Sequence, residues 1–263
     1  MQVIIRPTTE DAVALTAKLI TDAVNENPGI VLGLATGRTM EAVYADIVKA
    51  YEANEVDFSA CKSFNLDEYI GLAGDDKNSY RYYMNHHLFD KINIKKQNTY
   101  LPNGLAADEK EESARYEWAI KAAGGVDIQL LGIGEDGHIG FNEPLSSLAS
   151  RTRAKALTPE TYQQNSPLFD NPEDMPKRAF TMGVGTILDA KKVIMLVTGA
   201  KKADIVAKAV EGPVTSMISA TALQLHRNAI VIVDEAAAAN LQGKEYYNWI
   251  FENEPEWEAY RNK

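Results

Sequence analysis

Short and almost continuous apolar runs recur along the chain, separated by segments with helical periodicity. The runs cover residues 30–35, 126–131, 192–197 and 229–233. A run of this length without polar alternation is typical of a parallel strand that is buried on both faces. Strands that alternate with helices predict an α/β fold: a doubly wound, mostly parallel open sheet with helices on both faces, Rossmann-like in its connections.

The remaining elements fit the same plan. Helices are expected over residues 8–25, 40–51, 78–89, 106–123, about 200–210 and 215–225, with one or two more in the tail, and further strands over 2–5 and 62–66. Residues 151–177 are polar and contain several prolines, so we expect a long loop that acts as a lid. We therefore expect a single domain over residues 1–263, with the lid at about 151–177.

Composition narrows the classes of partner. The net charge of −10 argues against a general nucleic-acid binder, which would carry a basic face. No apolar run approaches the roughly 20 residues that span a bilayer, and the first residues lack the plan of a signal peptide. Cys61 is the only cysteine, which excludes an internal disulfide and fits a reducing compartment. We expect a cytoplasmic protein without nucleic-acid or membrane partners.

Polar side chains gather where four of the expected strands end. These junctions are residues 36–39, 67–68, 135–143 and 199–202. The carboxyl ends of parallel strands share one edge of a sheet, and ligands bind at that edge in open α/β folds. The sequence therefore predicts that the four junctions line one active site.

The junction after residue 131 also matches a dinucleotide-binding fingerprint. Residues 132–137 read GIGEDG, which fits G-x-G-x-x-G. That fingerprint requires a helix to begin inside it, and Gly140 and Pro144 break any helix here. No serine-hydrolase elbow, zinc-protease motif or cysteine cluster is present either. We expect an enzyme without a cofactor and without a metal.

Two junctions have the composition of anion sites. Residues 36–39 join an expected strand to a helix through a glycine and two hydroxyl residues, a common arrangement for binding phosphate. The alternative is an ordinary helix cap made by Thr36 or Thr39. At the second junction Lys201 and Lys202 precede a helix, where a bound anion would offset their charge. The alternative there is a pair of exposed lysines.

Carboxylates and one imidazole beside two anion sites suit general acid–base catalysis on a phosphorylated small molecule. Asp136 or Glu143 could orient His138, which then transfers protons at an oxygen. Asp67, from a different strand end, could act as a base at carbon.

Three stretches carry a family resemblance. Residues 134–144 read GEDGHIGFNEP, residues 65–69 read NLDEY and residues 184–190 read VGTILDA. Together they resemble the glucosamine-6-phosphate deaminase family, also called the glucosamine/galactosamine-6-phosphate isomerases. The related 6-phosphogluconolactonases share the Asp-Gly-His core and lack Phe-Asn-Glu-Pro. The resemblance implies conversion of glucosamine 6-phosphate and water to fructose 6-phosphate and ammonia.

The resemblance also implies roles for residues. His138, held by Asp136 and Glu143, would open the sugar ring, and Asp67 would transfer a proton from C2 to C1. The phosphate-binding residues that the resemblance implies are Gly37, Thr39 and Lys202. The segment 151–177 corresponds to the mobile lid of the family.

The chain departs from the family in the lid. Some members have a phosphate-binding arginine where this chain has Pro167, and we expect Arg38 to replace it. Part of an effector site is matched by Ser146, Arg153 and Lys155, although shorter members of this type look unregulated. We expect a monomer rather than a homo-oligomer. A lactonase-like hydrolase and a non-catalytic sugar-phosphate sensor remain alternatives.

Overall fold

The computed structural model describes residues 1–261, and its centre is a seven-stranded sheet in which every neighbouring pair of strands is parallel. The strands follow one another across the sheet in the order β1 (Gln2–Arg6), β10 (Ala229–Asp234), β9 (Lys192–Val197), β6 (Ile128–Leu131), β2 (Val31–Leu34), β3 (Lys62–Asn65) and β5 (Thr99–Tyr100). The expected parallel α/β sheet is confirmed. Strands β2, β6, β9 and β10 are buried along almost their whole length, which explains their continuous apolar sequences.

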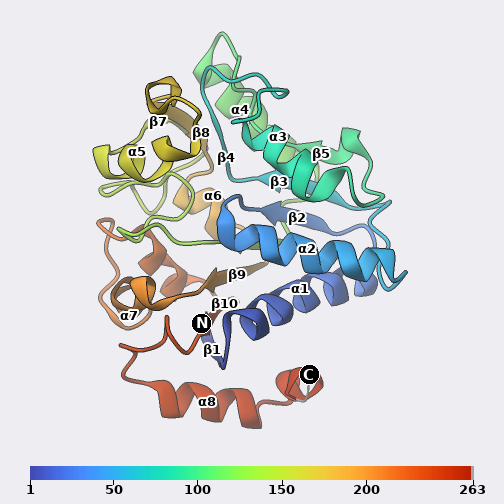
Figure 1. Cartoon of the computed structure of the whole chain (residues 1–263), viewed down its shortest axis with the longest axis vertical. Helices are drawn as coiled ribbons and strands as arrows, with labels where there is room; N and C mark the ends of the chain where they lie inside the picture. Colours follow the sequence, from blue (N-terminus) through green and yellow to red (C-terminus); the bar gives the residue numbers. More distant parts are fainter. Residues whose placement is uncertain (262–263) are drawn as a thin grey trace.

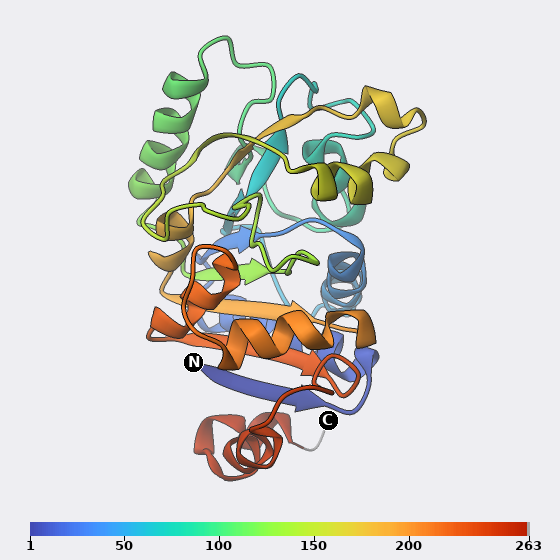
Figure 2. The same cartoon turned by 90° about the vertical axis from the view of Figure 1, so that its left-hand side faces the viewer.

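Helices cover both faces of this sheet (Figures 1 and 2). The helices are α1 (Thr9–Glu26), α2 (Arg38–Glu52), α3 (Tyr80–Met84), α4 (Glu109–Ala122), α5 (Pro159–Asn165), α6 (Val184–Leu188), α7 (Ala203–Glu211) and α8 (Lys244–Asn253). Helices α1 and α2 pack side by side on one face, and α7 lies on the other (Figures 1 and 2). The hydroxyl of Thr8 accepts a hydrogen bond from the N–H of Asp11 and begins α1 where the sequence predicted.

A second, antiparallel sheet was not predicted. Its strands lie in the order β4 (Asp67–Tyr69), β8 (Arg178–Thr181) and β7 (Arg153–Ala156). Strand β7, helix α5 and two short 3-10 turns, η3 (Ser166–Leu168) and η4 (Pro172–Asp174), replace much of the loop expected over 151–177. Strand β7 reads RAKA and is only partly buried, so it carries neither an apolar run nor a clear alternation.

Two smaller expectations need correction. The helix expected over 215–225 is a 3-10 helix, η6 (Ser219–Leu225), because the Thr221 hydroxyl bonds to both the N–H and the carbonyl of Thr215 and closes a turn there. Helix α3 ends in a π-helical turn, η1 (Asn85–Phe89). The tail forms α8 and the 3-10 helix η7 (Pro255–Tyr260), and α8 packs on the edge strand β1 (Figure 2).

Most apolar side chains belong to one core around the parallel sheet. A separate small cluster lies between the antiparallel sheet and the segment 151–177 and consists of Tyr69, Phe141, Phe169, Met175 and Ala179. None of the helices in the described part of the chain has the length and apolar character needed to cross a membrane.

Candidate active site

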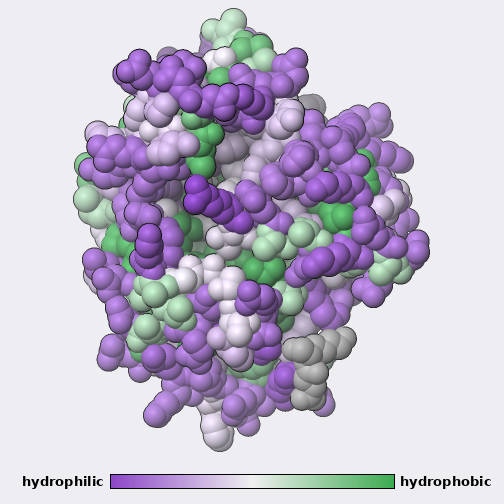
Figure 3. All heavy atoms as spheres, viewed as in Figure 1, coloured by the Kyte–Doolittle hydropathy of each residue, from purple (hydrophilic) through white to green (hydrophobic). Residues whose placement is uncertain are grey.

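A cavity of about 580 Å³ lies at the carboxyl ends of β2, β6 and β9. Its lining includes residues from all four predicted junctions, among them Arg38, Asp67, His138 and Lys202. The segment 151–177 forms another wall with residues of α5 and η3. Figure 3 shows a hollow in this region with mostly hydrophilic side chains around it. The sheet therefore brings the predicted residues together because their strands end at one edge.

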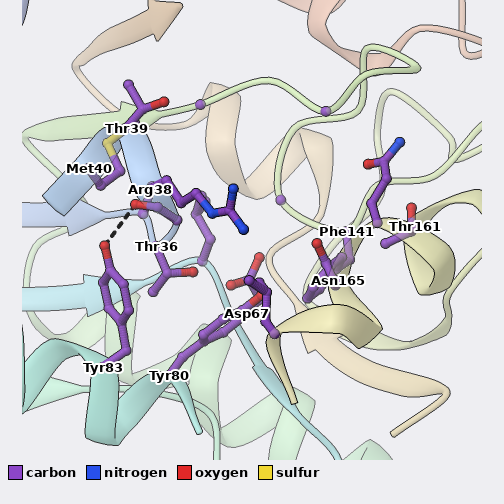
Figure 4. A pocket seen from close by; sticks show the side chains of 18 of the residues that line it. Thr36, Arg38, Thr39, Met40, Asp67, Tyr80, Tyr83, Phe141, Thr161 and Asn165 are labelled. Carbon is purple, nitrogen blue, oxygen red and sulfur yellow. Dashed lines mark hydrogen bonds between the residues drawn. The ribbon is translucent and has the colours of Figure 1, made fainter. Parts of the chain in front are cut away.

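The first anion junction lies at the start of α2. Gly37 precedes the helix with a φ of 114°, a conformation that favours glycine, and no side chain caps the helix. The alternative in which Thr36 or Thr39 caps α2 is therefore wrong. The carbonyl of Gly37 accepts a hydrogen bond from the Tyr83 hydroxyl at 2.8 Å, while Arg38 extends into the cavity on the side of Asp67 (Figure 4). An uncapped helix start beside a guanidinium is suited to an anion.

The second anion junction supplies one lysine to the cavity. Lys202 is half-buried and its Nζ donates to the carbonyl of Ile133 at 2.9 Å. Burial lowers the pKa of Lys202, and the charges of Glu135 and Asp136 oppose that change. Lys201 is exposed and does not line the cavity. Lys202 therefore fits the predicted anion site, and Lys201 fits the alternative of an exposed lysine.

The loop after β6 presents His138 between two carboxylates. Its Nδ1 lies 2.6 Å from Oδ1 of Asp136 and 3.4 Å from Oε2 of Glu143. Burial would raise the pKa of Asp136, but the hydrogen bond and charge of His138 outweigh it, and the pKa is lowered. With Nδ1 directed at both acids, the other ring nitrogen is left for the cavity. Both candidates for orienting the imidazole therefore contact it.

Glycine is required beside this imidazole. A Cβ at Gly134 would lie 2.4 Å from the ring of His138, and the N–H of Gly134 donates to the His138 carbonyl at 2.9 Å. The glycine thus allows the loop to fold back against its own histidine.

Asp67 lies across the cavity, on β4. Its side chain is 5% exposed, and within residues 1–261 its carboxylate has no hydrogen-bond partner. Burial and, to a smaller extent, the charge of Glu68 raise the pKa of Asp67 to about 8. Figure 4 shows Asp67 near Arg38, with Asn165 of α5 on the far side. A carboxylate of this kind is a stronger base than an exposed aspartate.

The acids and imidazole could also bind a cation. Ligand atoms of Asp136, His138 and Glu143 lie within 4.8 Å of one another. Oδ1 of Asp136 lies 2.6 Å from Nδ1 of His138, so a cation bound at this nitrogen would compete with that contact. The expected absence of a metal stays a prediction.

The residues matched to an effector site lie apart from the cavity lining. The guanidinium of Arg153 donates to Ser146 Oγ at 3.0 Å and to Asn142 Oδ1 at 2.8 Å. Lys155 is two residues farther along β7, on the same side of the strand. Pro167 is exposed on η3 and does not line the cavity.

Several cavity residues had no signal in the sequence. Tyr80 begins α3, and Thr161 and Asn165 belong to α5. Their position depends on how α3 and α5 pack over the sheet, and no local sequence pattern indicates that packing. The burial of Glu68 was not predictable from the sequence either, because two adjacent acidic residues are usually exposed.

Comparisons with known proteins agree with this architecture. The sequence pattern of the family described as "Glucosamine-6-phosphate isomerases/6-phosphogluconolactonase" matches residues 7–232. A protein of Shewanella loihica named glucosamine-6-phosphate deaminase is 50% identical over 250 residues, covering 95% of this chain and 93% of that protein. A solved structure described as a monomeric glucosamine-6-phosphate deaminase has a TM-score of 0.89 at 41% identity, covering 91% of this chain and all of that one. A 6-phosphogluconolactonase from Trypanosoma cruzi shares the fold, with a TM-score of 0.73 at 19% identity and coverage of 92% and 97%.

Proposed function

The chain belongs to the glucosamine-6-phosphate isomerase/6-phosphogluconolactonase family, and we propose that it is an enzyme that converts glucosamine 6-phosphate and water to fructose 6-phosphate and ammonia. One observation carries the proposal: a single cavity combines an imidazole between two acids, a buried carboxylate and two cationic side chains. This set provides proton transfer at oxygen, proton transfer at carbon and a site for phosphate.

His138 acts first, on the ring oxygen. Asp136 and Glu143 contact its Nδ1, which fixes the ring and favours the protonated form during the transfer. The remaining nitrogen delivers a proton to the ring oxygen as the bond from C1 to that oxygen breaks, and the neutral imidazole then takes the proton that the C1 hydroxyl loses. The aldehyde of the open sugar is the product of this step.

Asp67 acts next, on carbon. The carboxylate takes the proton from C2, and an enolamine forms as the electrons move toward the C1 oxygen, which receives a proton from His138. The same acid returns the proton to C1, which leaves an imine at C2. Water adds to that imine and ammonia leaves, giving the ketose. The raised pKa of Asp67 makes the transfer at carbon more favourable than it would be for an exposed aspartate.

The phosphate lies against the starts of α2 and α7. Gly37 and Thr39 offer backbone N–H groups, and Arg38 and Lys202 offer positive charge. Arg38 takes the place of the lid arginine of other members, since Pro167 has no donor.

We further propose a monomer in the cytoplasm, with the segment 151–177 as a lid. A structure at 41% identity is described as monomeric, which supports the first part. Sedimentation of the purified protein at several concentrations tests it.

The decisive experiment supplies glucosamine 6-phosphate to the purified protein and measures ammonia and fructose 6-phosphate together. Equal amounts of the two products are expected, while hydrolysis of 6-phosphogluconolactone is expected to be absent. A lactonase would reverse this pattern, and a sensor would bind without turnover. Asp67→Asn is the matched variant: turnover should fall by several orders of magnitude while binding persists, because the anion contacts remain.

A further inference from the structure

Glu68 is a buried carboxylate that the steps above do not use. Glu68 is 2% exposed, and within residues 1–261 its carboxylate forms no ion pair. Three backbone donors engage it instead: the N–H groups of Tyr69 and Tyr80 donate to Oε1, and that of Arg81 donates to Oε2, each at 2.9 Å. A carboxylate with three fixed donors is held in one position.

These hydrogen bonds connect β4 to the beginning of α3. Tyr80 lines the cavity, and its ring stacks on Phe141 with a centroid separation of 6.2 Å. The guanidinium of Arg81 donates to the hydroxyl and carbonyl of Thr99, and its positive charge lowers the pKa of Glu68. Glu68 therefore holds one wall of the cavity through the main chain of α3.

The charge of Glu68 is adjacent to the proposed carbon base. Asp67 precedes it on β4, and both residues are almost fully buried. The charge of Asp67 also raises the pKa values of three nearby phenols, those of Tyr69 on β4, Tyr80 on α3 and Tyr116 on α4. These phenols are neutral near pH 8, so Glu68 is the source of negative charge among them.

Arg38 and His138 line the same cavity as Asp67 from other elements. Both oppose the effect of a negative neighbour when they are charged. Both residues are present in every Glu68 variant and in wild type, so their effect on the pKa of Asp67 cancels when the pH profiles are compared.

We propose that Glu68 is a positioning residue for the carbon-acid step, which strengthens Asp67 as a base through its fixed charge and holds Tyr80 against the cavity. The inference rests on the proposed function. A negative neighbour makes a carboxylate bind its proton more tightly, and a tighter proton acceptor removes a proton from carbon more readily. Burial raises the pKa of Glu68 itself to about 7, while the three N–H donors on its carboxylate favour the ionised form.

The test is the pH dependence of kcat/KM in Glu68→Gln. Glutamine keeps the shape of the side chain and one acceptor oxygen but removes the charge. The acid limb of the profile should move to lower pH by on the order of one unit, as expected for neighbouring carboxylates at an effective dielectric constant of about 20. The substrate's own titrations are unchanged between variants, so the difference between profiles reports the enzyme.

Two variants separate charge from structure. Glu112→Gln is the control, because Glu112 is also buried and also accepts a backbone N–H, that of Asn103 at 2.7 Å, but it pairs with Arg115 and does not line the cavity. It should lower stability and leave the acid limb in place. Glu68→Asp retains the charge on a shorter side chain, so kcat should fall while the acid limb stays at the wild-type position.

An acid limb in Glu68→Gln that coincides with wild type would overturn the inference. If that variant does not fold, Glu68→Asp decides, and a displaced limb there would refute the role of the charge. In either case, active wild-type enzyme keeps the proposed function intact. Wild-type enzyme that releases no ammonia would instead remove the proposed function itself.

Discussion

Replacing Asp67 by asparagine is expected to stabilise the protein, and the gain should grow with pH. Burial, assisted by the charge of Glu68, raises the pKa of Asp67 to about 8. An aspartate in an unfolded chain has a pKa of about 3.9. Between these two values the folded protein retains a proton that the unfolded chain has released, so wild-type stability falls as the pH rises. Asparagine has no proton to lose and avoids this decline.

The two pKa values give the size of the effect. Each pH unit inside the window changes the free energy of unfolding by about 1.4 kcal/mol. Between about pH 5 and pH 8 the advantage of Asp67→Asn over wild type should therefore increase by up to about 4 kcal/mol. Above the folded pKa the difference should level off, because both states of the wild type are then ionised.

Urea unfolding at several pH values measures this directly. Asp75→Asn is the control, because Asp75 is exposed in the segment that leads to α3 and should follow wild type at every pH. A constant difference between Asp67→Asn and wild type across the range would show that the raised pKa is wrong, and with it the argument for a strong base. A variant that is more stable and inactive would show that catalysis requires a destabilising carboxylate.

Three further outcomes are expected. Arg38→Ala should raise KM by about 10-fold or more with little change in kcat, as for a charged hydrogen bond to phosphate, and an unchanged KM would count against the contact. Gly134→Ala should lower kcat by about 100-fold, because its Cβ displaces the ring of His138, and wild-type turnover would contradict the close approach. Prolonged dialysis against EDTA should leave activity unchanged, whereas a loss restored by Zn²⁺ would mean that Asp136, His138 and Glu143 bind a metal.

The parallel sheet was predictable because its inner strands are buried on both faces and are therefore apolar throughout. The same strands end in polar residues, so the meeting of Asp67, His138 and Lys202 at one edge followed from topology. The assignment of roles needed the family resemblance, since a strand end shows where a side chain lies and not which proton it moves.

The antiparallel sheet was not predictable from local pattern. Strand β7 is short and partly polar, and β4 holds Asp67 and Glu68, which are buried because other elements, α3 and β8 among them, pack against β4. The wall formed by Tyr80 depends on hydrogen bonds between Glu68 and α3, which join parts of the chain that no periodicity relates. The antiparallel sheet and the wall formed by Tyr80 therefore depend on tertiary packing and not on local sequence propensity.

The order of strands at the cavity has a consequence for substrate size. Arg38 follows β2, Lys202 follows β9, and His138 follows β6, which lies between them (Figure 2). Neighbouring strands are about 4.8 Å apart, and main-chain hydrogen bonds fix that spacing. In the proposed complex Arg38 and Lys202 hold the phosphate from either side of the strand that precedes His138, so the main chain of the sheet fixes the distance between the phosphate and the imidazole. A sugar phosphate one carbon shorter would be misplaced by roughly an ångström, and a displacement of that size can reduce the rate about 100-fold.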